Sequence, residues 1–417
     1  MEKEALKLWL LFRSQPPLWE GWDHAKTPIG FHDENRAVLF GHPGPTPDFS
    51  AKQVEGVRYH VALPKPPNFT ANTAVDLGGI ATATVMWQER EEEGFLGLIS
   101  HEAFHAFQQA RGCPFGNIAV AMHYPVNDYR VQALAEAEAE LLAKAVVPRS
   151  AREYTLAALD ARAARQALLA HEVAVYEDET ELSEGLATYV EIRSAGPDSE
   201  LWRTKVGALT KLNKGGWGGD RLRFYYSGLA WALLADRWAP GWQGKKWRPL
   251  AGIVAEAIGY GPSPDRREFP GLDFHEILGR QEKEAGERGA EMARTLGRAL
   301  PGTGLRVEFV SRSLPVGGGW DPRSAVTFPG AGRFHPDGLQ YTYPGGMEVK
   351  VGKDALEKEL CRRVVFEREN LSSSLDGAPL SPGKYTGRLE VTGADCRLIL
   401  PRGRICLEGG LLLAEEI

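Results

Sequence analysis

The stretch Phe95-Leu96-Gly97-Leu98-Ile99-Ser100-His101-Glu102-Ala103-Phe104-His105-Ala106-Phe107-Gln108-Gln109 predicts a central helix. It contains no proline and ends shortly before Gly112, a residue type that suits a helix C-cap. Residues four apart share a helix face, so His101 and His105 can present two imidazole nitrogens to one metal ion. Glu102 is rotated by about 100° from His101 and can therefore stand beside the ion, as a base acting on a metal-activated water.

The alternative interpretation is a pair of surface histidines on an amphipathic helix. With 10 histidines in 417 residues, chance would produce an HExxH pattern only about 0.02 times in such a chain. Apart from the two histidines, Glu102 is the only charged residue between Phe95 and Gln109. A solvated helix face would carry several lysines or arginines, so the surroundings favour a metal site.

A catalytic zinc site usually has three protein ligands and one open position, so a third ligand is needed. A third histidine in the metzincin spacing is excluded, because Gln108 and Arg111 stand where that pattern requires Gly and His. The remaining common choice is a glutamate on a second helix. Glu184 is the best candidate, and the competing glutamates are Glu172, Glu181 and Glu191.

The segment around Glu184 reads Glu181-Leu182-Ser183-Glu184-Gly185-Leu186-Ala187-Thr188-Tyr189-Val190-Glu191. Its Glu-Gly-x-Ala-x-Tyr pattern resembles the third-ligand helix of aminopeptidase-N-like and glycyl-aminopeptidase-like zinc peptidases, although Ser183 replaces the preceding Asn or His. The resemblance implies a gluzincin in which His101, His105 and Glu184 bind Zn²⁺. Small residues at Gly185 and Ala187 are expected to let this helix approach the HExxH helix closely.

A second segment, Arg223-Phe224-Tyr225-Tyr226-Ser227-Gly228, resembles the Tyr-x-x-Gly segment that follows the third ligand in those families. There the tyrosine stabilises the oxyanion, and the matching position is Tyr225. A phenol can donate this hydrogen bond without titrating near neutral pH. The alternatives are that Tyr225 is an aromatic core residue, or that the neighbouring Tyr226 has the role.

The resemblance covers roughly residues 80–238 and is incomplete. Glu184 follows His105 by 79 positions (184 − 105), a much longer spacing than in the aminopeptidase-N-like families, because an Ala- and Glu-rich helical pair over 131–175 is inserted. The Gly-x-Met-Glu-Asn signature of the exopeptidases is absent, and Gly78-Gly79-Ile80-Ala81-Thr82 is the nearest stretch. The resemblance therefore supports the clan and leaves the family and aminopeptidase activity unassigned.

The expected fold class is α+β: a thermolysin-like (gluzincin) catalytic unit plus a C-terminal β domain. Residues 1–90 are its β-rich N-terminal part, 91–301 its helical zinc-binding part, and 302–417 the separate β domain. The strand 80–87 is expected to form a sheet edge that binds substrate backbone. The other predicted elements are a short N-terminal amphipathic helix, a strand over 58–63, helices over 131–144, 151–175, 225–238 and 274–300, a loop over Gly215–Gly219, and strands over 307–310, 347–351, 363–368, 388–391 and 397–400.

Composition limits the classes of partner. The net charge is −6, and no long basic run is present, so nucleic acid is not an expected partner. No apolar stretch of 18 or more residues suggests a membrane span. Four cysteines without CxxC spacing favour a reducing cytoplasm and argue against a cysteine zinc site. The apolar run Leu8–Phe12 is too short for a signal peptide, although a removed leader is also compatible with the sequence.

The expected function is a zinc metallopeptidase that hydrolyses peptide bonds of a peptide or protein substrate, with Glu102 as general base and Tyr225 as oxyanion donor. The alternative is a non-catalytic, zinc-stabilised scaffold or binding module, which would keep the three ligands but have no need of Glu102. The sequence specifies neither the substrate, nor an endo- or exopeptidase action, nor the oligomeric state.

Overall fold

Helices and β-sheets both make up large parts of this chain, which confirms the predicted α+β class. The computed structural model describes residues 1–417 apart from 45–46, 89–90, 118–119, 121–123, 126–127, 147–150, 198, 209–216, 245, 262–267, 314, 320–325, 329–331 and 360–361. The chain divides into two compact units, Met1–Asn117 with Val131–Ile277, and Ile118–Arg130 with Leu278–Ile417. This division falls within the long helix α11 (Phe274–Ala299), whereas the sequence suggested a boundary after residue 301.

The first unit begins with a helix and a six-stranded sheet. The predicted N-terminal helix is α1 (Glu2–Arg13), which buries Leu6, Trp9 and Phe12. The strands follow the order β3-β4-β2-β1-β6-β5, and only the β1–β6 pair is parallel. Their bounds are β1 (Ile29–His32), β2 (Ala37–Phe40), β3 (Ser50–Val54), β4 (Val57–Ala62), β5 (Thr73–Leu77) and β6 (Ile80–Met86).

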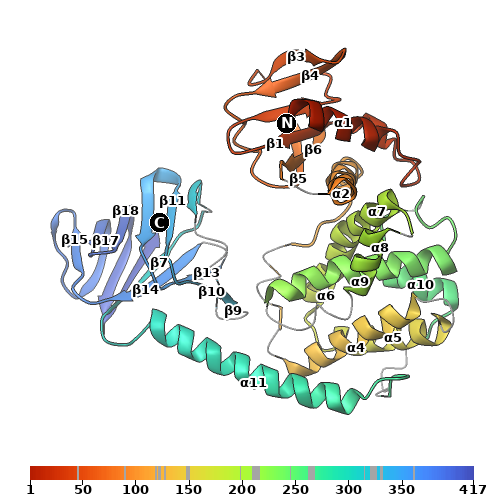
Figure 1. Ribbon diagram of the computed structural model, residues 1–417. Coiled ribbons are helices and arrows are strands. Elements are labelled where there is room, and N and C mark those ends of the chain that lie inside the picture. Colours follow the sequence, from red (N-terminus) through yellow and green to blue (C-terminus); the bar gives the residue numbers. More distant parts are fainter. Residues whose placement is uncertain are drawn as a thin grey trace. The chain divides into compact units, whose positions relative to one another are not determined.

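The prediction that the strand 80–87 forms a sheet edge is wrong. β6 lies between β1 and β5, so β5 is the edge strand on this side of the sheet. β5 has no clear sequence pattern, because this strand is short and mostly half-exposed. The helix α2 (Glu92–Ala110) packs against both β5 and β6 (Figure 1).

The rest of the first unit is helical (Figure 1). The helices are α4 (Tyr129–Ala145), α5 (Ala151–Gln166), α6 (His171–Thr180), α7 (Leu186–Ala195), α8 (Glu200–Gly207), α9 (Trp217–Trp238) and α10 (Leu250–Ile258). A π-helical turn, η2 (Glu181–Gly185), lies between the helices α6 and α7 and is named the π-turn.

Two predicted helix boundaries are wrong. The expected helix over 151–175 is two helices, because the backbone turns at residues 167–170 and Ala170 is extended, with φ −63° and ψ 148°. No proline or glycine marks this break, so the residue pattern could not show it. Part of the expected Gly-rich loop is helical, since α9 begins at Trp217 and includes Gly218 and Gly219. Two glycines cost about 1 kcal/mol each, which a long helix can tolerate; Gly215 and Gly216 lie outside the described residues.

The second unit is built mainly from β-strands and has its own hydrophobic core, which includes Phe309, Val349, Phe366 and Leu398. The main strand order is β16-β15-β17-β18-β19-β7-β14-β13-β10-β9, and β12 joins β11 to β18. The five strands predicted in this region lie within β7 (Leu305–Val310), β12 (Met347–Val351), β14 (Arg363–Arg368), β17 (Gly383–Thr392) and β18 (Cys396–Glu408). The others are β8 (Gly317–Gly319), β9 (Val326–Phe328), β10 (Gly332–His335), β11 (Leu339–Tyr343), β13 (Ala355–Lys358), β15 (Ser372–Leu375), β16 (Ala378–Pro379) and β19 (Leu411–Glu416).

Within the described ranges, no helix combines the length and the apolar character needed to cross a membrane. Three of the four cysteines, Cys113, Cys396 and Cys406, carry free thiols. The fourth, Cys361, lies outside the described residues.

Candidate metal centre

The HExxH residues lie in the middle of α2, where the helix is almost completely buried. His101, Glu102 and His105 are only 7%, 6% and 8% exposed. The ring centroids of the two histidines are 4.8 Å apart, as the four-residue spacing on one helix face predicts. The helix ends at the expected place: Gly112 adopts φ +63°, and the Cys113 N–H donates to the Gln108 carbonyl in a Schellman arrangement.

The structure brings Glu184 to these histidines. Its Oε2 atom lies 3.6 Å from His101 Nε2 and 3.3 Å from His105 Nε2. One ligand atom from each residue can be chosen so that all three lie within 4.8 Å of one another. The competing glutamates are elsewhere: Glu172 is exposed at the start of α6, Glu181 pairs with Arg162, and Glu191 contacts the far nitrogen of His101.

Each histidine has its second ring nitrogen engaged by another side chain. His101 Nδ1 lies 3.1 Å from Glu191 Oε2, and Lys205 holds the other Glu191 oxygen at 2.9 Å. His105 Nδ1 lies 2.8 Å from Gln108 Oε1. A histidine that donates from Nδ1 in this way has its Nε2 lone pair available for a metal ion.

Sequence reasoning missed both outer partners. Glu191 was considered only as a competitor for the ligand position, and Gln108 only as evidence against a third histidine. Helical spacing contained a usable signal, because Glu191 is seven residues after Glu184 and therefore on the same helix face. Gln108 is three residues after His105 and can reach back to it.

Glu184 lies within the π-turn between α6 and α7. The Leu186 N–H donates to the Glu181 carbonyl five residues back, as the wider π-helical turn requires. Such turns are frequent at functional sites. The π-turn places Glu184 opposite the two histidines and Gly185 against α9.

The predicted role of Gly185 needs correction. A Cβ atom on Gly185 would lie 2.5 Å from the Cα atom of Gly228, so this glycine permits close approach to α9 and not to α2. On α2 the corresponding residue is Gly97, where a Cβ atom would lie 3.2 Å from Glu191 Cγ and 2.7 Å from a Leu201 methyl group. Several helices of this chain contain small residues, so the sequence alone could not show that Gly185 packs against α9 and that Gly97 is the close-contact residue of α2.

The contact between Gly185 and Gly228 places α9 close to the π-turn, and Tyr225 on α9 therefore lies at the site. The Tyr225 ring stacks on the His101 ring, with centroids 6.1 Å apart and an interplanar angle of 16°. Arg221, one turn earlier on α9, donates to Glu184 Oε1 at 3.0 Å. Tyr226 has a different environment: its ring lies 5.9 Å from the Lys205 ammonium. Of the two tyrosines, Tyr225 is thus the one that lies against a ligand histidine.

Burial and charge shift the pKa values of these groups. Burial raises the pKa of Glu102, and burial together with the negative charge of Glu184 raises that of Tyr225. For His101, burial opposes the charged form, but hydrogen bonds with Glu184 and Glu191 raise its pKa to about 10. For Glu184, burial is outweighed by hydrogen bonds with His101 and His105, which hold its pKa far below the usual range. The carboxylates of Glu102, Glu184 and Glu191 thus favour a positive charge between them.

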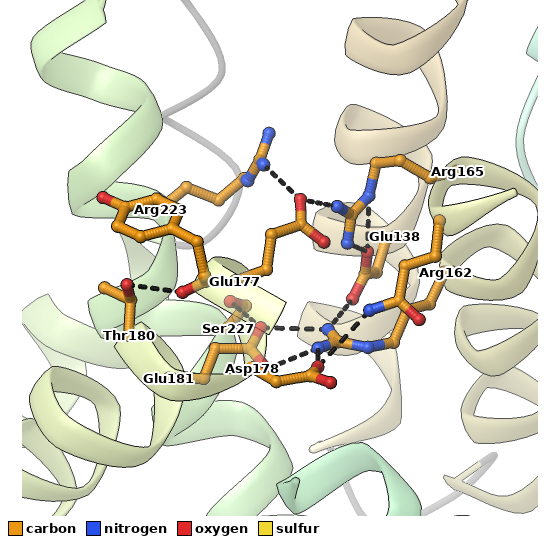
Figure 2. A network of polar contacts seen from close by, with 11 residues as sticks. Glu138, Arg162, Arg165, Glu177, Asp178, Thr180, Glu181, Arg223 and Ser227 are labelled. Atoms are coloured by element: carbon orange, nitrogen blue, oxygen red, sulfur yellow. Dashed lines mark hydrogen bonds and ion pairs between the residues drawn. The ribbon is translucent and has the colours of Figure 1, made fainter. Parts of the chain in front are cut away.

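A buried ionic network lies behind the π-turn (Figure 2). Arg162 on α5 pairs with Glu181 at 2.8 Å and with Glu138 on α4 at 3.0 Å, and Ser227 on α9 donates to Glu181 at 2.6 Å. The rest of the network links four further charged side chains to these: Arg165 to Glu138 and Glu177, Arg223 to Glu177, and Asp178 to Arg162. The helices α4 and α5 therefore supply charged partners of the turn that carries Glu184.

The residues present fit a metal ion. Two imidazole nitrogens and one carboxylate oxygen converge, and this donor set is typical of catalytic zinc sites. In the comparisons with protein-family models, with curated proteins and with solved structures, no significant match to this chain was found.

Proposed function

We propose that this chain is a zinc-dependent peptidase with a thermolysin-like (gluzincin) catalytic unit, in which His101, His105 and Glu184 hold Zn²⁺. One observation carries the proposal. Both Nε2 atoms point at the same Glu184 oxygen, at 3.6 and 3.3 Å, while both Nδ1 atoms are engaged by Glu191 and Gln108. Three protein ligands leave a fourth position for a water or a substrate, as in catalytic zinc sites.

When bound, the zinc ion supplies a Lewis acid that lowers the pKa of a water molecule and polarises a carbonyl group. Glu102 stands beside the ligands on the same helix. It accepts the proton of the attacking water and returns it to the leaving amine. The Tyr225 hydroxyl donates a hydrogen bond to the oxyanion, because its raised pKa keeps it protonated at neutral pH.

A peptide substrate needs a surface that holds its backbone. The edge strand β5 packs next to α2, and among the described strands it pairs with β6 alone. Its free edge can accept an extended peptide by strand addition, the role that the sequence assigned to β6. The substrate in this proposal is a peptide or an unfolded protein segment.

Glu102 distinguishes the peptidase from a zinc-stabilised scaffold. A scaffold needs the three ligands and their outer partners, and it gains nothing from the additional carboxylate of Glu102, which is 6% exposed in an apolar helix. A general base, in contrast, belongs at this position.

The test is Glu102→Gln, which keeps the side-chain shape and removes the base. Cleavage of casein should fall by about 10²–10⁴, since this is the usual contribution of a general base, while zinc content by elemental analysis stays at one per chain. Glu92→Gln, an exposed position on the same helix, is the matched control and should cleave at the parent rate. Full activity in Glu102→Gln would contradict the mechanism. Stoichiometric zinc in a parent protein that cleaves no peptide of a broad library would favour the scaffold.

A further inference from the structure

The Gln108 side chain bridges one candidate ligand and the segment that carries another. It is completely buried. Its Oε1 atom lies 2.8 Å from His105 Nδ1, and its Nε2 atom donates to the carbonyl oxygens of Leu182 and Ser183 at 2.8 and 3.0 Å. Leu182 and Ser183 are the two residues before Glu184 in the π-turn.

The chemistry of these contacts fixes the orientation of the amide. Backbone carbonyls only accept hydrogen bonds, so the end that faces Leu182 and Ser183 must be the NH₂ group. The end that faces His105 is then the amide oxygen, which can only accept. His105 must therefore carry its proton on Nδ1, and its Nε2 lone pair is left facing Glu184.

The π-turn explains why this support is required. A turn with i to i+5 hydrogen bonding is wider than the α-helix and leaves backbone carbonyls to be satisfied by other groups. Gln108 donates from α2 to the carbonyl oxygens of Leu182 and Ser183 in this turn, and the Ser183 oxygen also accepts the Leu186 N–H. Glu181 is the first residue of the same turn, and its carboxylate accepts hydrogen bonds from Arg162 and Ser227 (Figure 2).

We propose that Gln108 is a positioning residue that couples two ligands: its oxygen fixes the tautomer and direction of His105, and its NH₂ group fixes the turn from which Glu184 projects. The inference rests on the proposed metal site. It predicts that a single neutral side chain, which touches neither substrate nor metal, sets the metal affinity through two ligands together.

The test compares Gln108→Met with Gln109→Met in the full-length protein. Methionine keeps the length of the side chain and removes both hydrogen-bonding ends. Gln109 is the exposed neighbour on the same helix and serves as the matched control. The zinc dissociation constant, measured by competition with a chromogenic chelator, should rise about 10- to 100-fold in Gln108→Met, a typical result of losing an outer partner, and stay unchanged in Gln109→Met.

A double-mutant cycle separates coupling from a general loss of stability. Gln108→Met should weaken zinc binding much less in a Glu184→Ala background than in the parent, because the ligand that it positions is gone. Equal effects in both backgrounds, or a dissociation constant within about threefold of the parent in Gln108→Met, would overturn the inference. A parent protein that binds no zinc would overturn the proposed function itself, so the two failures are distinguishable.

A measurement on the parent protein covers the case in which Gln108→Met does not fold. Long-range ¹H–¹⁵N NMR spectra of the zinc-loaded, histidine-labelled protein should show every metal-bound imidazole with a protonated Nδ1 and the metal on Nε2. Coordination of the metal by His105 through Nδ1 would contradict the assigned orientation of Gln108.

Discussion

At the scale of single residues, the candidate site is defined by what each ring nitrogen and carboxylate already contacts. Glu191 and Gln108 engage the outer nitrogens of the histidines, and Arg221 holds the outer oxygen of Glu184. The side-chain atoms that remain, two Nε2 atoms and one Oε2 atom, face one another. Such outer contacts typically change metal affinity 10- to 100-fold, so they belong to the site as much as the ligands do.

Tyr225→Phe tests the oxyanion role. The variant keeps the ring that stacks on His101 and loses only the hydroxyl group, so zinc content should not change. The rate of peptide cleavage should fall by about 10²–10³, which is typical of one oxyanion donor. Tyr226→Phe, at the next position on α9, is the control and should stay within about twofold of the parent. Equal rates for Tyr225→Phe and Tyr226→Phe would assign Tyr225 to packing alone.

Glu181 provides a test of pH dependence. Burial raises its pKa to about 7, against the lowering effect of Arg162, and the network of Figure 2 contains three arginines but four acidic residues. The folded-state pKa of Glu181 lies above the unfolded value near 4.5. The contribution of Glu181 to the free energy of unfolding is therefore fully present below about pH 4.5 and is lost as pH rises through 7. The loss should be about 1–3 kcal/mol.

The measurement is urea unfolding of the parent and of Glu181→Gln at pH 5 and pH 8. Glutamine stays neutral, so the stability difference between parent and variant should shrink from pH 5 to pH 8. A difference that grows over this range would mean that Glu181 is held ionised by Arg162, with its pKa lowered.

At the scale of elements, the site depends on two close helix contacts. Gly97 brings α2 against Glu191 on α7, and Gly185 and Gly228 bring the π-turn against α9. The contact at Gly97 places Glu191 beside His101, and the contact between Gly185 and Gly228 places Tyr225 beside the same histidine. The helices α4 and α5 support the π-turn through Glu138 and Arg162.

Gly185→Ala should disturb the site without touching a ligand. The new methyl group would meet the backbone of Gly228 at 2.5 Å, so α9 must shift. We expect a loss of stability of about 1–3 kcal/mol and weaker zinc binding. Gly252→Ala on α10 is the matched control: the nearest atom would be 3.9 Å away, and alanine in a helix should stabilise by about 0.5–1 kcal/mol. Thermal unfolding and zinc titration of both variants are the measurements. Unchanged zinc affinity in Gly185→Ala would mean that the helix contact does not determine the site.

The elements that could be predicted from sequence are those with a regular pattern. The HExxH helix has helical periodicity and a glycine C-cap, and the C-terminal strands show alternation, so both were found. The break between α5 and α6 was missed, because residues 167–170 contain neither glycine nor proline. The edge strand β5 was missed because its side chains are mostly half-exposed.

The site itself was predictable only in part. His101 and His105 follow from local spacing, and Glu184, 79 positions later, was selected through a family resemblance. Helical spacing places Gln108 within reach of His105 and Glu191 on the face of Glu184, but the contact of Glu191 with His101 depends on how α2 and α7 meet, which no local pattern encodes. The ionic network depends on the packing of four helices and could not be read from the chain.

At the scale of the whole molecule, the proposed metal centre belongs to one unit. Every residue assigned to it lies between His101 and Tyr225, and, in the part of the chain that the structure describes, the hydrophobic core of that unit includes no residue beyond Phe274. The strands of the second unit pack around a core of their own, from Leu305 to Ala414.

A protein that ends at residue 301 should therefore stay folded and bind zinc with the affinity of the full chain. Circular dichroism and the chelator competition assay are the measurements, and the isolated residues 302–417 can be examined in parallel. An insoluble or unfolded truncated protein would show that residues 302–417 stabilise the first unit.

The most direct test of the central claim is anomalous scattering at the zinc edge from crystals of the zinc-loaded protein. We predict one peak per chain, bound by His101 Nε2, His105 Nε2 and a Glu184 oxygen, with the fourth position open to solvent or water. A zinc ion elsewhere, a fourth protein ligand that closes the site, or no peak after zinc loading would contradict the assignment of this chain as a zinc peptidase.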